Sequence, residues 1–466
     1  MSNTNYTPSR RKFVKQLSSI AAAAGATQLN WTSKENLILP YKKPVGKTYS
    51  ANDTIGLAVV GMGIMGNKNL ETAIQIPGTK LIGVCDLYDG RLERAKEVYG
   101  KDILTTRDYE ELLDNDDVDA VYVATSDHWH DKIAIAALKK GKHVYCEKPM
   151  VHQLEEGHGI IKAQKSSGKV LQVGSQRVSS IVYQAARDRY KAGDIGELVL
   201  AEIFYDRQSA LGAWQYSIPR DASAKTVDWK RFIGDAPERA YDPMRFFRWR
   251  NYQDYGTGVA GDLFVHLFSG LHMILESKGP DRIYATGGLR YWKDGRDVPD
   301  IMLGSYDYPE TDSHPAFNVQ MRVNFIDGGG GGSAIRLVGT EGVMTIGWND
   351  IKIVRSKLPE APGYGGWDTF FTFTEAQQAE YKKWYESTYP EKPAMKGPTE
   401  MTYSAPDGYS DHWDHHWNFL KAVRAGTPVL EDAEFGLQAA GPALATNMSY
   451  FQNKIINWDP VKMIVT

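Results

Sequence analysis

The sequence has few of the features that mark membrane, nucleic-acid-binding or disulfide-stabilised proteins. No apolar run is long enough to cross a bilayer as a helix. The formal net charge is only -3, so nothing attracts the chain electrostatically to nucleic acid or to an anionic membrane. There are only two cysteines, Cys85 and Cys146, and both lie in apolar strand-like stretches. We therefore expect two buried thiols and no structural disulfide.

The composition that remains is that of an ordinary folded protein. Hydrophobic residues make up 42% and charged residues 24% of the 466 residues, which is a globular balance and not a disordered one. A chain of this length exceeds what one compact core usually holds, so we expect two domains.

The N-terminal segment resembles a twin-arginine export signal. Arg10 and Arg11 follow Ser9, and an alanine-rich apolar stretch then leads to the small-residue sequence Ala24-Gly25-Ala26. A plain basic tail is the alternative, but the order of these features favours export to the periplasm. No cysteine lies near the expected cleavage site, so we expect no lipid anchor there and no stable membrane anchor. Residues 1–53 are interpreted as signal and linker.

The periodicity after the linker predicts an α/β fold with two domains. In residues 54–176, short apolar strands alternate with helical stretches, which is typical of a parallel sheet with helices on both faces, a Rossmann dinucleotide-binding domain. In residues 177–466, longer strand candidates predominate, which favours an α+β domain with a large open, mostly antiparallel sheet. We expect a hairpin that turns at residues 340–342, a hairpin loop at residues 328–332, an irregular excursion over 357–410, and closing helices over 411–425 and 433–452.

A glycine-rich turn is the sharpest local motif. It comes directly after a strand, opens a helix, and consists of Gly61, Met62, Gly63, Ile64, Met65 and Gly66. The glycines allow a tight turn and let the backbone approach a pyrophosphate, which then lies at the helix N-terminus. Asp86 follows 20 residues after Gly66, at the end of the next strand, where it can bind ribose hydroxyls and repel a 2′-phosphate. NAD is therefore favoured over NADP, although Arg91 and Arg94 leave NADP as an alternative.

Two further motifs carry candidate catalytic groups. Glu147 and Lys148 follow the strand that ends at Cys146, at the sheet edge where such folds bind ligands. Lys148 could transfer a proton there, although a lysine at a strand end is most often solvated. Asp262 and His266 are four residues apart in an apolar helical stretch, which would place them on one face. They could handle a hydroxyl proton while a cofactor accepts hydride, or simply satisfy one another in a core.

Taken together, these motifs resemble the Gfo/Idh/MocA oxidoreductase family. GMGIMG, ATSDHWH, CEKPM and GDLFVH occur in this order, and the likeness extends to the closing EDAEFGLQAA. The resemblance implies a Rossmann domain, a second open-sheet domain that mediates homo-oligomerisation as a dimer or tetramer, and oxidation or reduction of ring hydroxyls of sugars or polyols. It implies that Lys148, Asp262 and His266 are catalytic and that Glu147 lies near the nicotinamide ribose. By position it also implies cofactor contacts from Ser126, His130 and Gln176, and substrate contacts from Arg177, Arg248 and Tyr255.

A histidine-rich segment lies outside the resemblance. His412 and His416 share one face of a predicted helix, and His415 lies between them. A metal site would need further ligands and supporting contacts, so we favour packing or an interface and expect no metal.

Three functional hypotheses follow. The first is a sugar or polyol dehydrogenase with NAD bound before export, because the periplasm holds no large free nicotinamide pool. The second is a redox-neutral cycle, either hydride exchange between two sugars or the oxidation, elimination and reduction of family 109 glycoside hydrolases; the lysine of the EKP motif argues against a close match to those glycosidases. The third is a non-catalytic relic that binds sugar or nucleotide, since a fold alone does not establish activity.

Overall fold

The computed structural model describes residues 34–46, 49–50, 53–390 and 399–466. The predicted twin-arginine signal lies outside these residues. Within them the chain forms two sheets, one of six strands and one of eleven. Across these same described stretches, no helix combines the length and the apolar character needed to cross a membrane.

The six-stranded sheet is entirely parallel and confirms the predicted Rossmann-type domain. Its two central strands are buried along their whole length, as expected for strands with helices on both faces. In spatial order the strands are β4 (Leu104–Thr106), β3 (Thr79–Cys85), β2 (Ile55–Val60), β5 (Ala120–Val123), β6 (His143–Cys146) and β7 (Leu171–Val173). The helices between them are α2 (Ile64–Ala73), α3 (Asp89–Tyr99), α4 (Tyr109–Leu113), α5 (His130–Lys139) and α6 (Gly157–Ser167).

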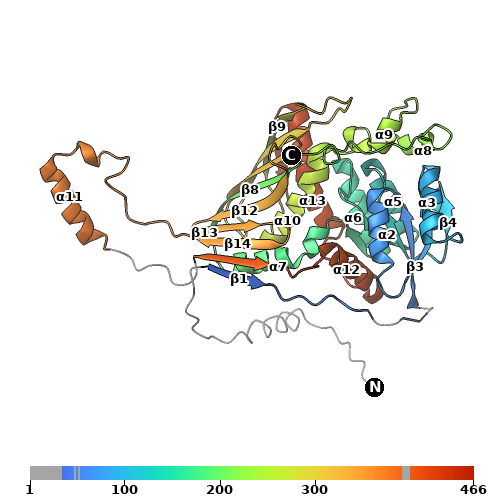
Figure 1. Cartoon of the computed structure of the whole chain (residues 1–466), viewed down its shortest axis with the longest axis horizontal. Coiled ribbons are helices and arrows are strands. Elements are labelled where there is room, and N and C mark those ends of the chain that lie inside the picture. Colours follow the sequence, from blue (N-terminus) through green and yellow to red (C-terminus); the bar gives the residue numbers. More distant parts are fainter. Residues whose placement is uncertain (1–33, 47–48, 51–52, 391–398) are drawn as a thin grey trace, which may run out of the picture.

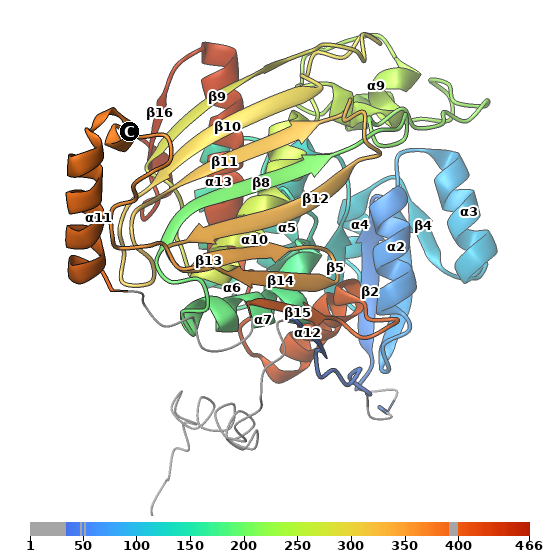
Figure 2. The ribbon, with the colours of Figure 1, turned by 60° about the vertical axis from the view of Figure 1, so that its left-hand side comes forward.

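The second sheet is open and mostly antiparallel, as predicted, and it curves across the molecule beside the first domain (Figure 2). Side chains along its central strands alternate between buried and exposed, because one face packs on helices and the other faces outward. In spatial order its strands are β1 (Lys34–Ile38), β15 (Glu400–Ser404), β14 (Asp350–Arg355), β13 (Gly342–Ile346), β12 (Gly332–Gly339), β8 (Leu198–Asp206), β11 (Phe317–Asn324), β10 (Ile301–Tyr308), β9 (Arg282–Gly288), β16 (Ile456–Asp459) and β17 (Ile464–Val465).

Three helices cover the inner face of this sheet: α7 (Ile181–Lys191), α10 (Val265–Leu275) and α13 (Ala433–Gln452). Ten of the eleven residues of α10 are buried, because it packs against both α7 and α13 under the sheet. This explains why its sequence is apolar on every face and not on one stripe. The shorter helices α8 (Trp229–Ile233) and α9 (Pro243–Phe247) lie above the Rossmann domain (Figure 1).

The chain crosses between the two domains more often than the sequence indicated. Strand β1, in the region interpreted as linker, pairs in parallel with β15 at the edge of the large sheet. Helix α12 (Asp411–Ala425) begins and ends where predicted, but it packs on α2, and its Phe419 and Leu420 join the hydrophobic core of the Rossmann domain. Both contacts join segments far apart in sequence, so local periodicity did not reveal them.

The loops also differ from the expectations in two places. Residues 328–332 do not close a hairpin, because β8 lies between β11 and β12. The predicted excursion over 357–410 contains helix α11 (Glu375–Thr388), which extends away from the body of the molecule (Figure 1), and strand β15. The predicted turn at 340–342 is present between β12 and β13, and a further strand, β14, follows.

Gly66 provides a test of how closely α2 packs on the glycine-rich turn. A Cβ atom at Gly66 would lie 1.8 Å from the carbonyl oxygen of Gly61, whereas a Cβ atom at the exposed Gly159 of α6 would meet only Ile135 at 3.4 Å. Both glycines are helical, so alanine improves helix propensity at each. We expect Gly66→Ala to lower the free energy of unfolding by about 1–3 kcal/mol. Gly159→Ala should instead raise it by about 0.5–1 kcal/mol. Urea denaturation measures both, and equal effects would contradict the close packing.

Candidate active site

The glycine-rich turn joins β2 to α2 as the sequence predicts. Gly61 has a φ of +94°, a backbone conformation that residues other than glycine rarely adopt. A Cβ atom there would lie 2.5 Å from the carbonyl oxygen of Ala124. The backbone N–H of Met62 donates a hydrogen bond to Oδ2 of Asp86 over 2.8 Å. The turn and the end of β3 are therefore fixed to each other.

The residues at this turn fit a dinucleotide. Helix α2 begins with no side-chain cap and no acidic residue in its first turn, so its N-terminus can face a pyrophosphate. Asp86 is buried and pairs with Arg91, whose Nη1 lies 3.2 Å from Oδ2. Backbone N–H groups of Met62 and Tyr88 donate to the two oxygens of Asp86 and fix the carboxylate at the end of β3. The ion pair neutralises the arginine that could favour a 2′-phosphate.

One cavity of about 1100 Å³ runs from this turn to the second domain. Every residue predicted to contact the cofactor lines it except Gly66, which packs beneath the turn. All three predicted catalytic residues also line it. The full predicted set at the cavity is Gly61, Met62, Gly63, Ile64, Met65, Asp86, Ser126, His130, Glu147, Lys148, Gln176, Asp262 and His266.

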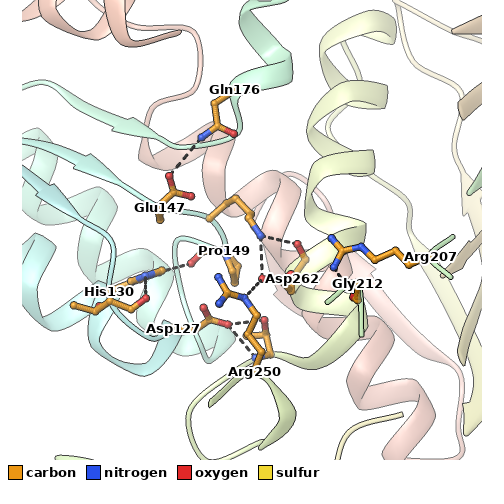
Figure 3. A network of polar contacts seen from close by, with 12 residues as sticks. Asp127, His130, Glu147, Pro149, Gln176, Arg207, Gly212, Arg250 and Asp262 are labelled. Carbon is orange, nitrogen blue, oxygen red and sulfur yellow. Dashed lines mark hydrogen bonds and ion pairs between the residues drawn. The ribbon is translucent and has the colours of Figure 1, made fainter. Parts of the chain in front are cut away.

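Asp262 holds the centre of the cavity together. Lys148 Nζ lies 3.0 Å from Asp262 Oδ1 and also donates to the Asp262 carbonyl oxygen over 2.8 Å (Figure 3). Arg250 Nε donates to the same Oδ1 over 3.1 Å. Burial alone would raise the pKa of Asp262, but the positive charges of Lys148 and Arg250 outweigh it and hold this pKa below its usual range. One carboxylate thus balances two cations from different parts of the chain.

The backbone around Asp262 departs from the α-helix that we predicted. Residues Ala260–Phe264 form a single π-helical turn, and the α-helix α10 starts only at Val265. Such turns often occur at functional sites. Asp262 and His266 still face the same cavity, across the junction of the two helical forms.

His266 is neutral in this setting. Burial and then the charge of Lys148 lower its pKa well below the usual value. Its Nδ1 atom is buried and finds no hydrogen-bond partner among the described residues. A neutral ring has a lone pair that can accept a proton, so His266 can act as a proton relay next to Lys148.

Glu147 is fixed by a polar network under the cavity. Its Oε1 accepts a hydrogen bond from Asn69 Nδ2 over 2.8 Å. The same oxygen accepts a second one from Gln176 Nε2 over 3.4 Å (Figure 3). Asn69 Oδ1 lies 3.1 Å from Nε2 of His412 on α12. Burial raises the pKa of Glu147, while Asn69 and Lys148 partly offset that rise. The network links α12 to the position that the family resemblance assigns to the nicotinamide ribose.

Ser126 and His130 lie on the opposite wall, after β5. Nδ1 of His130 lies 2.8 Å from the carbonyl oxygen of Pro149 and Nε2 lies 3.3 Å from that of Thr125, so the ring ties β5 to the Lys148 segment. Asp127 lies beside them, and its Oδ2 accepts hydrogen bonds from both the backbone and the hydroxyl of Thr257 (Figure 3).

The three residues predicted to contact substrate do not line the cavity. Arg177 pairs with Asp411 over 2.8 Å and stacks on Trp348, which fixes α12 to the large sheet. Arg248 donates to the carbonyl oxygen of Tyr216. Tyr255 is fully buried against Phe232.

Other residues of the second domain line the cavity. Arg250 is two residues beyond Arg248 in the same segment, which spacing alone could not resolve. Arg207 follows the last residue of β8, a strand-end position of the kind that drew attention to Lys148. The second-domain part of the cavity is lined by Tyr205, Arg207, Leu211, Trp214, Tyr216, Ser217, Trp249 and Arg250.

The histidines of α12 form packing and hydrogen-bond contacts. His416 is fully buried and stacks on Tyr145, and its Nε2 lies 3.2 Å from Nε2 of His412. His415 contacts Ser179 and the carbonyl oxygen of Val173. Within the described part of the chain, no group of three or more histidine, cysteine or acidic side chains is placed to bind a metal ion. Cys85 and Cys146 are buried and unpaired.

Comparison with known proteins finds a family match for the first domain. Residues 55–175 match the GFO_IDH_MocA model, described as "Oxidoreductase family, NAD-binding Rossmann fold". The match spans the Rossmann-type domain with the six-stranded parallel sheet. This agrees with the open N-terminus of α2 and with the buried Asp86.

Relatives and solved structures extend the likeness. The chain is 34% identical over 156 residues to a "scyllo-inositol 2-dehydrogenase (NAD(+))" of Bacillus subtilis (strain 168), covering 33% of this chain and 45% of that protein. It is 26% identical over 242 residues to a "Glycosyl hydrolase family 109 protein" of Shewanella sp. (strain W3-18-1), covering 48% and 50%. The chain thus spans half or less of these relatives' length. A "Levoglucosan dehydrogenase, complex with NADH and levoglucosan" shares the fold, with a TM-score of 0.58, 18% identity, and coverage of 87% of this chain and 99% of that one.

Asp86 offers a test of cofactor choice. Asp86→Asn keeps an acceptor for the Met62 N–H but removes the charge that pairs with Arg91. We expect the Kd for NAD to rise about tenfold, the equivalent of one charged hydrogen bond. Because Arg91 is released, the Kd for NADP should rise less or fall. Calorimetric titration with both nucleotides measures this, and an unchanged ratio of the two Kd values would contradict the assignment.

Proposed function

We propose that the protein is an NAD-dependent oxidoreductase that transfers hydride between NAD and a ring CH–OH group of a sugar, glycoside or polyol. One observation carries the proposal: the Lys148–Asp262 pair lies in the same cavity as the glycine-rich turn. A proton-transfer group and a nucleotide-binding turn in one cavity are what hydride chemistry on an alcohol requires.

Each catalytic side chain has a distinct task. Bound NAD supplies the hydride acceptor. Lys148 donates two of its three N–H groups to Asp262, which leaves the third to hydrogen-bond the substrate hydroxyl and position its proton for transfer to His266. Asp262 holds Lys148 in place and balances its charge, and neutral His266 relays the hydroxyl proton.

Cofactor retention forms a second part of the proposal. Arg10 and Arg11 resemble a twin-arginine signal, so we propose export to the periplasm with NAD already bound. Such an enzyme must restore its own NAD, by reducing a second sugar or another acceptor in the same cavity. Assembly into a dimer or tetramer through the second domain is also proposed from the family resemblance.

A glycosidase is the second candidate, favoured by the similarity to glycosyl hydrolase family 109 proteins. In that case oxidation would activate a glycoside for elimination of its aglycone before the hydride returns. Aryl glycosides incubated with the protein and no added cofactor separate the two. Release of the aglycone supports the glycosidase, whereas a keto sugar or exchange between two sugars supports the dehydrogenase.

Lys148 provides the main test, and Lys142 is its matched control. The two lysines flank the same strand β6 at opposite ends and are similarly buried. Nζ of Lys142 donates to the carbonyl oxygen of Asn115, and Lys142 does not line the cavity. We expect Lys148→Met to lower turnover by about 10²- to 10⁴-fold while NAD still binds, because the proton-transfer group is lost. Lys142→Met should keep its turnover.

Formation of reduced nicotinamide, followed by absorbance, measures turnover, and calorimetry measures NAD binding. Undiminished turnover in Lys148→Met would refute the assignment. Loss of NAD binding in that variant would instead give Lys148 a role in holding the cofactor.

A further inference from the structure

The end of the cavity beyond Lys148 carries more positive than negative charge. Lys148, Arg207 and Arg250 all line it, and Asp262 is the carboxylate that two of them share. Asp127 lies next to Arg250 (Figure 3) and adds a second carboxylate, whose pKa burial raises and whose Oδ2 accepts hydrogen bonds from Thr257, so three cations face two carboxylates. The neutral ring of His266 adds no charge to this end.

Arg207 is the cation without an acidic partner. Among the described residues, no carboxylate lies within ion-pair distance of its guanidinium, and its one side-chain hydrogen bond runs from Nη1 to the carbonyl oxygen of Gly212 over 2.8 Å. Its guanidinium points from the end of β8 toward Asp262 (Figure 3). Four of its five N–H donors therefore remain for a ligand.

The surroundings of Arg207 hold the guanidinium in place. Its Cζ lies 5.1 Å from the ring centroid of Tyr205 and 5.6 Å from that of Phe325. The two rings restrict the motion of the Arg207 side chain, while the N–H edge of its guanidinium stays free for a ligand. This restriction lowers the conformational entropy that is lost when a ligand binds. The hydrogen bond to Gly212 uses one N–H group of Arg207 to order the loop after β8. The other N–H groups of the guanidinium have no such structural role.

We propose that Arg207 binds a carboxylate of the substrate, so that the enzyme acts on sugar acids, such as hexuronic acids and their glycosides, in preference to neutral sugars. The inference rests on the proposed function, whose site it specifies further. A guanidinium presents parallel N–H donors that match the two oxygens of a carboxylate, and the excess positive charge favours an anion. Tyr205, Tyr216 and Trp249 line the same end and offer ring faces and hydroxyls to the sugar.

Matched sugar pairs test this proposal on the full-length protein loaded with NAD. Glucuronate against glucose and galacturonate against galactose differ at one carbon, which is a carboxylate in the first and an alcohol in the second. We expect at least one acid to bind about 10- to 100-fold more tightly than its neutral partner, the strength of charged hydrogen bonds. In Arg207→Gln that preference should disappear while the Kd for the neutral sugar changes less than about threefold.

Two further variants separate a specific contact from general effects. Arg207→Lys keeps the charge but not the planar donor pair, so it should keep part of the preference. Arg336→Gln removes a cation on β12 that pairs with Glu202 outside the cavity, and it should leave the preference unchanged. NAD affinity, measured on each variant, should equal that of the unmodified protein.

Equilibrium binding distinguishes failure of this inference from failure of the proposed function. Equal binding of acid and neutral sugars, no binding of either acid, or equal loss of both kinds of sugar in Arg207→Gln would overturn the role of Arg207. Turnover of neutral sugars without any preference would leave the oxidoreductase intact and remove the sugar-acid specificity. Binding of a uronate that depends on Arg207, without formation of reduced nicotinamide, would support this inference and contradict the proposed function.

Discussion

The buried charge of Asp262 is the constraint on which the active site depends. Its carboxylate is nearly inaccessible and lies in a cavity between two domains, where an unpaired charge would be costly. Lys148 reaches it from the end of β6 in the Rossmann domain, and Arg250 reaches it from the second domain. Removal of either cation would leave a poorly balanced buried charge, so the pairing that fixes Lys148 in the cavity also joins the domains.

Several features around Asp262 hold Lys148 and its neighbours in place. The π-helical turn at Ala260–Phe264 presents both the side chain and the carbonyl oxygen of Asp262 to Lys148. Glu147, the neighbour of Lys148 in sequence, is held by Asn69 and Gln176. Consecutive residues after one strand thus contact both halves of the cavity, with one bonded to the nucleotide-binding side and the other to the second domain. Loss of order at this strand end should therefore affect cofactor and substrate together.

Most features that depend on residues close together in sequence could be predicted from the sequence. The glycine-rich turn, Asp86 and the buried strands are determined within a few tens of residues, so composition and periodicity revealed them. Lys148, Asp262 and His266 were found through the order of motifs, and the structure brings them into one cavity. Whether they carry the chemistry stays a prediction.

Helix α11 was missed although its start is local, with Thr374 and Gln377 forming a capping box, whereas the other missed features depend on long-range contacts. Strand β1 pairs with β15, and α12 packs on α2, which lies more than 300 residues earlier in the chain. Arg248 and Arg250 are alike in sequence, and only the tertiary structure determines which of them faces Asp262. The proposal for Arg207 rests on the absence of a nearby acidic partner among the described residues, which only the tertiary structure reveals.

The nucleotide content of the purified protein tests the central claim most directly, that this cavity holds NAD for hydride transfer. The protein is purified without added cofactor, and the nucleotide released on denaturation is identified by its absorbance and mass. We predict close to one NAD or NADH per chain. A protein that emerges empty, and that then binds NAD weakly or not at all, would contradict the account.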